Sequence, residues 1–208
     1  MAAKILMLRS HVSQSLLNQA QFRHFAEKYH MRLYSDCPDL IVQSHKRRFA
    51  LRAAIEGAWT LVMFHPAAYT PVCSTEVVRL SQLRAECPFP LKAISIIPDK
   101  LSVAQNWIAQ LNARTRTGVQ HDCVSDREFV LSRAFGFDEG HLETENLRGY
   151  FIFDPRARLR SFSILPKEVG FSSFEIIRVI SALVATDSSD GLAPVDWTPG
   201  DQLLDYAV

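Results

Sequence analysis

One short apolar run, Trp59–Phe64, constrains the fold more than any other feature of this chain. A strand with one face in water alternates apolar and polar residues. Thr60 is the single polar residue in this run, which therefore predicts a strand buried on both faces. Leu91–Ile97 is a second, largely apolar run, and apolar residues recur at helical spacing after each of the two. Buried strands that alternate with helices predict an α/β fold in which helices flank a central sheet.

Two spacings of apolar residues, every second residue for a strand and every third or fourth for a helix, predict the other elements. Helices are predicted over residues 14–28, 75–86, 102–111, 128–135 and 174–184, and further strands over 39–43, 48–51, 122–125, 150–153 and 159–165. The last two strands are joined by the turn Asp154-Pro155-Arg156 and predict a hairpin, which makes the central sheet mixed.

We expect three parts in the chain: an N-terminal helical extension at residues 1–31, an α/β domain at 32–185 and a C-terminal segment at 186–208. The first thirty residues hold four basic side chains and a single acid, Glu27. This composition favours an amphipathic helix packed on the domain or on a partner subunit. An organelle-targeting peptide, which is also basic and poor in acids, is the alternative. The C-terminal segment carries Trp197, so we expect it to dock onto another surface.

The composition excludes several classes of protein. Of the 208 residues, 48% are hydrophobic and 22% are charged, which is typical of a folded globular chain. A formal charge of +1 argues against binding nucleic acid or anionic membranes by bulk electrostatics. No apolar run is long enough to predict a transmembrane helix.

Four cysteines, Cys37, Cys73, Cys87 and Cys123, lie far apart and form no C-x-x-C pair. This spacing argues against a zinc knuckle and against a dithiol exchange motif. We recognise no secretory signal, so we predict a reducing, cytoplasmic location, with targeting by the N-terminal extension as the alternative. The sequence contains no phosphate-binding loop and no cluster of metal-ligand residues, so we predict neither a cofactor nor a metal.

Cys73 has surroundings that activate a thiol. It follows a buried strand and a loop that contains Pro66 and Pro71, and it lies where the next helix begins. Unpaired backbone N–H groups and the helix dipole stabilise an anion there, so the pKa of the thiol should fall below its ordinary value of about 8.5. The alternative is that Cys73 is a small buried apolar residue, as most single cysteines are.

The spacing Pro66-x-x-x-Thr70-x-x-Cys73 resembles the active-site signature of peroxiredoxins, which are thiol peroxidases with a thioredoxin-like fold. Leu147–Pro155 is similar to the strand of that family whose arginine faces the reactive sulfur. Pro194–Asp201 resembles the C-terminal segment of the 1-Cys (Prx6-like) subgroup of the AhpC/TSA family. The resemblance covers most of the chain. It implies a thioredoxin-like mixed sheet flanked by helices, plus a C-terminal extension.

The resemblance also implies roles for the side chains around Cys73. Its thiolate would attack one oxygen of a hydroperoxide and become a sulfenic acid. Thr70, Arg148 and the backbone N–H of Cys73 would hold the peroxide and stabilise the charge that develops on the leaving oxygen. Pro66 would shield the sulfenic acid from water.

His65 and Glu76 are further candidates for binding the substrate. His65 matches a histidine that often precedes the signature proline of the family. The alternative is a histidine at the end of a strand, bonded to the backbone. Glu76 falls in the first turn of the helix, where its carboxylate could orient a cation.

The resemblance implies a 1-Cys mechanism, in which an external thiol such as glutathione or a thioredoxin-like protein regenerates the enzyme. No cysteine follows Cys123, so the C-terminal resolving cysteine of 2-Cys relatives has no counterpart. Cys87 follows Cys73 on the same predicted helix at roughly 20 Å, which is too far for a disulfide. Resolution by Cys87 or Cys123 stays open as an alternative. The subgroup also implies a homodimer, with the C-terminal segment at the interface.

A second class of function stays open: a peroxide-sensing redox switch, or a partner-binding protein, with little turnover. The segment Tyr34–Leu40 replaces the Gly-Asp-x-Ala-Pro-Asp-Phe motif that is usual in the family, and an extension precedes it. Rapid consumption of peroxide with a physiological thiol would favour the peroxidase. Stable oxidation that changes the assembly of the protein would favour the switch.

Overall fold

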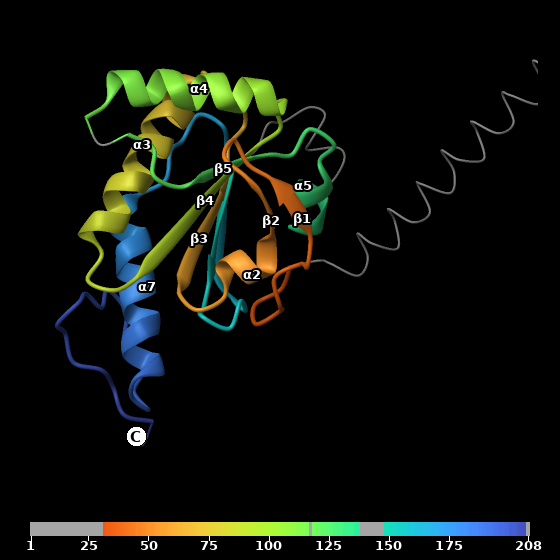
Figure 1. The fold of residues 1–208 in the computed structure, drawn as a ribbon. Helices are drawn as coiled ribbons and strands as arrows, with labels where there is room; N and C mark the ends of the chain where they lie inside the picture. The colour runs from red at the N-terminus through yellow and green to blue at the C-terminus, as the bar shows by residue number, and fades with distance from the viewer. Residues whose placement is uncertain (1–30, 117, 138–147, 207–208) are drawn as a thin grey trace, which may run out of the picture.

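The computed structural model describes residues 31–116, 118–137 and 148–206, and a five-stranded mixed sheet forms its centre (Figure 1). The strands lie in the order β5-β4-β3-β6-β7. Their bounds are Trp59–Phe64 (β3), Leu91–Ile97 (β4), Asp122–Ser125 (β5), Arg148–Phe153 (β6) and Leu159–Leu165 (β7). The first three are mutually parallel, whereas β6 and β7 run antiparallel to their neighbours. The predicted α/β fold with a mixed sheet is confirmed.

Helices cover both faces of this sheet. Figure 1 shows α3 (Pro71–Glu86) and α7 (Ser173–Asp187) on one face, with α4 (Leu101–Arg114) across the end of α3. The other face carries two short helices, α2 (Leu51–Ile55) and α5 (Val130–Ala134), and a small hairpin of β1 (Ile41–Gln43) and β2 (Arg48–Ala50).

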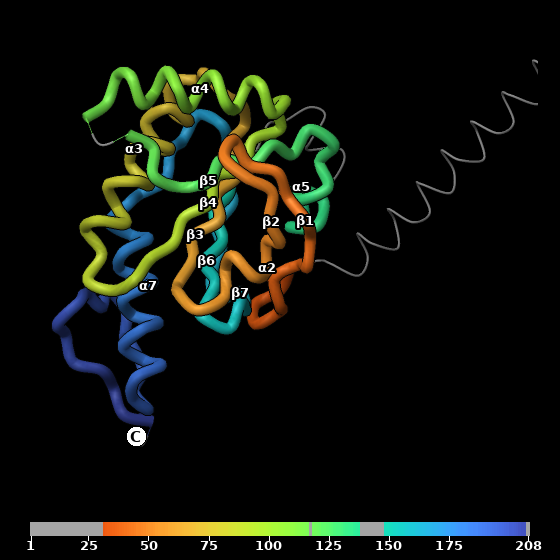
Figure 2. The backbone as a smooth tube through the Cα atoms, viewed as in Figure 1, coloured from red at the N-terminus to blue at the C-terminus, as the bar shows by residue number. Residues whose placement is uncertain are grey.

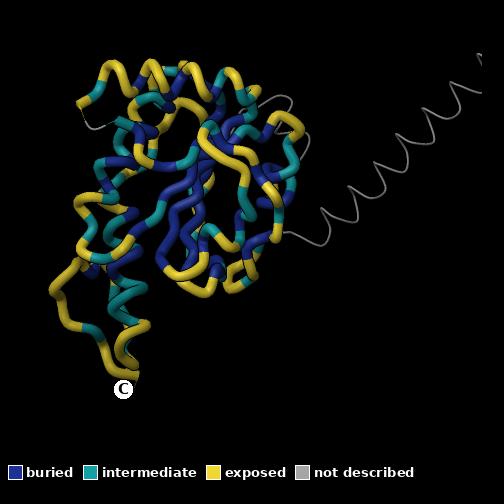
Figure 3. Tube along the Cα trace, viewed as in Figure 1, coloured by how far each residue is buried: buried dark blue, intermediate teal, exposed yellow. Residues whose placement is uncertain are grey.

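Every residue of β3 is buried, as its apolar sequence predicts. Leu61 and Met63 pack against residues of α3 and α7, whereas Val62 and Phe64 contact the opposite core, which includes residues of α2 and α5. Successive side chains of a strand point to opposite faces, so a strand between two helical layers is buried at every position. The one polar residue, Thr60, pairs its hydroxyl with the carbonyls of Ile55 and Ala58. Figure 3 shows the buried residues gathered along the strands at the centre of the molecule.

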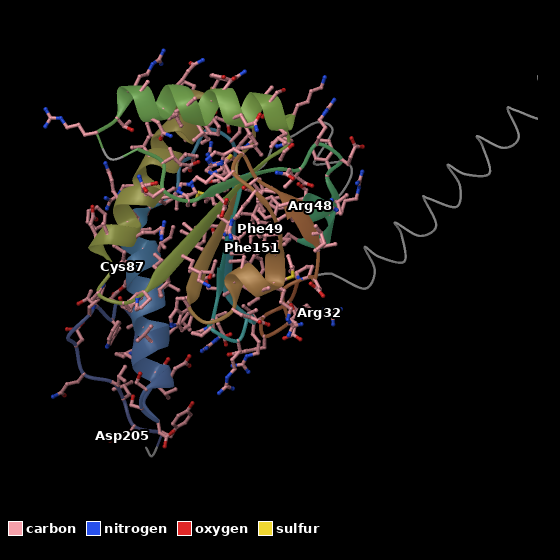
Figure 4. The ribbon with its side chains drawn as sticks, in the orientation of Figure 1. Arg32, Arg48, Phe49, Cys87, Phe151 and Asp205 are labelled. Carbon is pink, nitrogen blue, oxygen red and sulfur yellow. The ribbon has the colours of Figure 1, made fainter. Side chains whose placement is uncertain are left out.

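An aromatic cluster fills the core on the α5 side. The ring of Phe64 lies 4.9 Å from that of Phe135 and 5.6 Å from that of Phe151, centroid to centroid. Most of these rings meet at steep angles, the geometry that aromatic quadrupoles prefer. Figure 4 labels Phe151, which lies on β6 in this core, and Phe49 of β2, which packs against it.

Two helices, α3 and α2, differ most from the sequence prediction. Helix α3 begins at Pro71 rather than at residue 75, because proline at the first helical position needs no N–H partner and already has a helical φ. Helix α2 is missed by the sequence prediction, which assigns its first residue, Leu51, to the strand over 48–51; with five residues the helix is too short to show a helical period. The helix predicted over residues 14–28 lies outside the described residues.

The C-terminal segment turns back beside α7, as the tube in Figure 2 shows. Trp197 is only 4% exposed, and the guanidinium of Arg178 on α7 donates a hydrogen bond to its carbonyl at 3.2 Å. Leu192 and Leu204 pair through their backbones and close the segment into a loop. Within the described ranges, no helix is long and apolar enough to cross a membrane.

The burial of β3 predicts a large energetic difference between two leucines. Leu61 is fully buried, whereas Leu33 is 51% exposed. Leu61→Ala should lower the free energy of unfolding by about 2–5 kcal/mol because it leaves a cavity in a closely packed core. Leu33→Ala should change it by less than about 0.5 kcal/mol. Urea unfolding followed by circular dichroism measures both, and equal losses would contradict the arrangement of the sheet.

Candidate active site

The loop between β3 and α3 gathers most of the candidate residues. It leaves β3 at His65 and Pro66, both of which are buried. The backbone N–H of Ala68 donates to the Asp99 carboxylate at 2.8 Å, which fixes the middle of the loop. Tyr69 adopts a left-handed conformation with φ of 61°, which costs a residue other than glycine on the order of 1 kcal/mol. The hydrogen bond at Ala68 helps to hold this turn against that cost.

Cys73 lies in the first turn of α3. Thr70 is the N-cap residue, but its hydroxyl donates to the Ala67 carbonyl at 3.2 Å instead of accepting from a first-turn N–H. The start of the helix is therefore not capped by this side chain, and the positive end of the helix dipole lies in the same turn as the thiol. Cys73 is fully buried. The sequence prediction that Cys73 lies where a helix begins is confirmed.

Arg148 brings a fixed positive charge to this sulfur from the first residue of β6. Its guanidinium Nη1 lies 3.6 Å from Cys73 Sγ and also contacts the Glu76 carboxylate. Its Nη2 donates to the Lys167 carbonyl at 2.7 Å. Arg148 is 2% exposed, so its charge acts with little screening by water.

Glu76 lies one turn after Cys73 and holds the two cationic groups together. One carboxylate oxygen contacts Arg148 and also pairs with His65 Nδ1 at 3.0 Å. The other accepts the backbone N–H of Phe171 at 3.1 Å. This carboxylate therefore orients both side chains that approach the sulfur, as the sequence suggested for a cation.

The ring of His65 is bonded to side chains, not to the backbone. Nδ1 faces Glu76, and Nε2 lies 3.0 Å from Ser95 Oγ on β4. A ring nitrogen of His65, the Cys73 sulfur and a Glu76 oxygen all lie within 4.8 Å of one another. The structure thus brings His65, Pro66, Thr70, Cys73, Glu76 and Arg148, all six candidate residues, to one place.

The Cys73 thiol is acidic in spite of its burial. Burial raises its pKa, but the hydrogen bond and charge of His65, together with Thr70 and the backbone of Ala67, outweigh burial and lower the pKa to about 7. Burial also lowers the pKa of His65, yet contacts with Cys73 and Glu76 outweigh it and raise the pKa overall. The two groups stabilise each other as a thiolate and an imidazolium.

The three ligand-type residues His65, Cys73 and Glu76 are close enough to hold a metal ion. The guanidinium of Arg148 already contacts two of them. A fixed positive charge in that place repels a metal cation and stabilises an anionic sulfur. The arrangement therefore fits a reactive thiolate better than a metal site.

The other cysteines lack such surroundings. Burial raises the pKa of Cys37, and it raises the pKa of Cys123 to about 12. Cys87 caps the C-terminal end of α3, where Figure 4 labels it, and partial burial raises its pKa too. All four cysteines are free thiols. Cys73 is thus the only one of them whose pKa lies below its ordinary value.

Sequence reasoning missed two buried polar residues next to the site. Ser95 bridges His65 to His121, whose Nε2 lies 2.9 Å from Ser95 Oγ. The only feature of the sequence that could have indicated a role for Ser95 is its hydroxyl group inside a largely apolar strand. His121 precedes β5 between Gln120 and Asp122, a polar setting that predicts exposure, yet it is 3% exposed.

Comparison with known proteins points to one family. The model of the AhpC/TSA family matches residues 34–162. A peroxiredoxin of Treponema denticola is 27% identical over 177 residues, which cover 85% of each chain. A 1-Cys peroxiredoxin of Dictyostelium discoideum is 25% identical, over 84% of this chain and 73% of its own. The solved structure of a yeast mitochondrial 1-Cys peroxiredoxin has a TM-score of 0.73 and 26% identity, and the match covers 83% of this chain and 85% of its own. These likenesses confirm the expected thioredoxin-like fold.

The balance around Cys73 predicts how its pKa responds to loss of the histidine. His65→Leu should raise the pKa of Cys73 well above about 7, because burial raises this pKa and His65 makes the largest contribution that lowers it. Titration of the ultraviolet absorbance of the thiolate measures this pKa, since the pKa values of the other three thiols are raised. Cys73→Ser is the control that identifies the titrating group. A midpoint that does not move in His65→Leu would show that His65 does not set the pKa.

Proposed function

Because the chain belongs to the AhpC/TSA family and is a thiol peroxidase of the peroxiredoxin type, we propose that Cys73 is its peroxidatic nucleophile. The substrates are hydrogen peroxide and organic hydroperoxides. One observation carries this proposal: a buried thiol with a pKa of about 7 contacts the guanidinium of Arg148 and lies beside His65. A thiolate in such surroundings is a strong nucleophile at neutral pH.

The proposed reaction transfers one oxygen atom to sulfur. The Cys73 thiolate attacks the terminal oxygen of the hydroperoxide, an S–O bond forms and the O–O bond breaks. The sulfur is oxidised to a sulfenic acid, and the peroxide is reduced to an alkoxide, or to hydroxide from hydrogen peroxide. The imidazolium of His65 supplies the proton that turns this anion into an alcohol or water.

In this proposal the residues around Cys73 bind the peroxide, orient the charged groups and limit the access of water. Arg148 and the Thr70 hydroxyl hold the peroxide and stabilise charge on the leaving oxygen, an effect worth roughly 3 kcal/mol per well-placed donor. Arg148 is suited to this, since its Nε has no hydrogen-bond partner among the described residues. Glu76 orients Arg148 and His65, and buried Pro66 limits the access of water.

We assign the regeneration of Cys73 to an external thiol. Cys87 lies at the opposite end of the sixteen-residue helix α3. A rise of about 1.5 Å per residue places it about 20 Å from Cys73. Cys123 is fully buried, and its raised pKa of about 12 keeps it a protonated, unreactive thiol. The solved yeast relative is described as resolved through glutathione and thioredoxin systems. Glutathione or a thioredoxin-like protein is accordingly the reductant we propose.

We also propose a homodimer in which the C-terminal segment lies at the interface and residues 32–185 form the peroxidase domain. Three observations support it. Strand β7 is an edge of the sheet. Phe174, at the start of α7, is 83% exposed, and Val195 in the C-terminal segment is 89% exposed. Large apolar side chains left in water mark a surface that a partner covers.

Oxidation by peroxide tests the role of Cys73. After a few seconds with one equivalent of hydrogen peroxide, mass spectrometry with a sulfenic-acid trap should find one added oxygen on Cys73. Cys73→Ser should lose peroxide consumption, whereas Cys37→Ser, Cys87→Ser and Cys123→Ser should retain it. If Cys73 instead forms a disulfide with another cysteine of the chain, that cysteine resolves the sulfenic acid and the proposed external reductant is wrong. Full consumption by Cys73→Ser would refute the proposed nucleophile.

The oligomeric state tests the proposed interface. Phe174→Asp should convert the dimer to a monomer in analytical ultracentrifugation, because a buried carboxylate without a partner is costly. Ile41→Asp is the matched control: Ile41 is 60% exposed, but it lies in β1 on the opposite face of the sheet. A wild-type monomer, or equal effects of the two substitutions, would contradict this interface.

A further inference from the structure

A row of buried polar side chains leads away from the active site beneath α3. His65 Nε2 lies 3.0 Å from Ser95 Oγ, Ser95 Oγ lies 2.9 Å from His121 Nε2, and His121 Nδ1 lies 3.1 Å from Ser81 Oγ. The backbone N–H of Gln120 donates to Ser81 Oγ at 3.0 Å. The four side chains form one continuous hydrogen-bonded chain.

The topology of the sheet makes this row possible. His65 follows β3, Ser95 lies on β4 and His121 precedes β5, so the three come from adjacent parallel strands. Glu76 and Ser81 lie on the buried side of α3 above them. This layer is otherwise apolar, with residues such as Leu80 and Val77 in it. Buried polar groups in such a layer cost free energy unless every one of them is paired.

The hydrogen-bonding capacity of each group limits how the protons are arranged. His65 Nδ1 faces a carboxylate, which accepts, so Nδ1 carries a proton. When His65 is neutral, its Nε2 accepts from the Ser95 hydroxyl, and His121 Nε2 can then donate to Ser95. When His65 is charged, Nε2 donates to Ser95, and the Ser95 hydroxyl must turn towards His121.

His121 is suited to follow this reversal. Burial, the charge of His65 and the charges of Arg84, Lys46 and His45 lower its pKa to about 3, so it stays neutral and carries a single ring proton. It therefore accepts at Nε2 when His65 is charged, and donates from Nδ1 to Ser81. It adopts the opposite tautomer when His65 is neutral.

We propose that Ser95 and His121 are positioning residues for the reactive sulfur, which hold His65 in the charged form beside Cys73 through a tautomer change of His121. This inference rests on the proposed function of Cys73. Loss of Ser95 leaves the imidazolium without its acceptor, and loss of His121 leaves the Ser95 hydroxyl without the group it donates to while it accepts from the imidazolium. The imidazolium is then less stable, and the thiolate that it stabilises becomes harder to form.

Other charged groups also act on His65 and Cys73, and the test must leave them in place. They are Glu76 from α3 and Arg148 from β6, with Arg84, Lys46 and His45 around His121. Ser95→Ala and His121→Leu alter none of these charges, since Ser95 and His121 are both neutral. A change in the titration of Cys73 then reports the hydrogen-bonded chain itself.

The thiolate titration of Cys73 provides the first measurement. Ser95→Ala and His121→Leu should raise its pKa by about one unit, the effect of losing one hydrogen bond to a charged group. His121→Gln should stay close to the wild type, because its amide can still accept from Ser95. Ser181→Ala is the matched control: Ser181 Oγ is buried without a hydrogen-bond partner among the described residues. That variant should not shift the pKa.

The rate of Cys73 oxidation by hydrogen peroxide provides the second measurement. For Ser95→Ala the rate should fall about fivefold near pH 7 and recover to about the wild-type value near pH 9, where both proteins are thiolates. A loss at every pH with an unchanged pKa would reveal a purely structural role and overturn the inference, as would no change at all. A wild-type Cys73 that neither titrates near 7 nor reacts with peroxide would instead refute the proposed function itself.

Discussion

A sulfur anion held out of water is the constraint on which the rest of this site depends. Removing an ion from water costs several kcal/mol unless compensating charge and hydrogen bonds surround it. Cys73 has no exposed surface, yet its pKa is about 7. The hydrogen bond and charge of His65, together with Thr70 and the backbone of Ala67, provide the compensation, and the guanidinium of Arg148 lies 3.6 Å from the sulfur. Each of them must therefore be placed to within a fraction of an ångström by the surrounding fold.

The mixed sheet is what makes that placement possible. Phe64 at the end of β3 pairs with Gly149 on the antiparallel strand β6. The next residues, His65 and Arg148, consequently lie at the same end of two neighbouring strands, although they are far apart in the sequence. A parallel β6 would carry its first residue to the opposite end of the sheet. Glu76, on the helix that follows β3, then ties the two cationic groups together.

The sequence predicts much of this arrangement because its strongest signals are local. Trp59–Phe64 is apolar except at Thr60, and Pro66, Thr70 and Cys73 have the spacing of a known signature, so β3 and the reactive loop could be placed. Helix α2 could not, because five residues show no period. His121 could not either, since its burial depends on α3 packing over β4 and β5. Contacts between distant segments leave no periodic trace in the chain.

The burial that stabilises the proposed thiolate also constrains how it can be regenerated. A second sulfur must approach to about 2.05 Å to form a mixed disulfide, and no surface of Cys73 is open to it. The first turn of α3 has to move before an external thiol can react. Thr70 does not cap that turn, and Tyr69 before it holds a strained conformation. Ser74 Oγ nevertheless anchors the turn, because it donates to the Thr70 carbonyl at 2.8 Å and accepts from Trp107 Nε1 at 3.3 Å. Below the first turn, Glu76 and Ser81 anchor α3 to the polar row on the sheet. Regeneration therefore has to break the hydrogen bonds of the first turn, while the contacts of Glu76 and Ser81 can keep the rest of the helix in place.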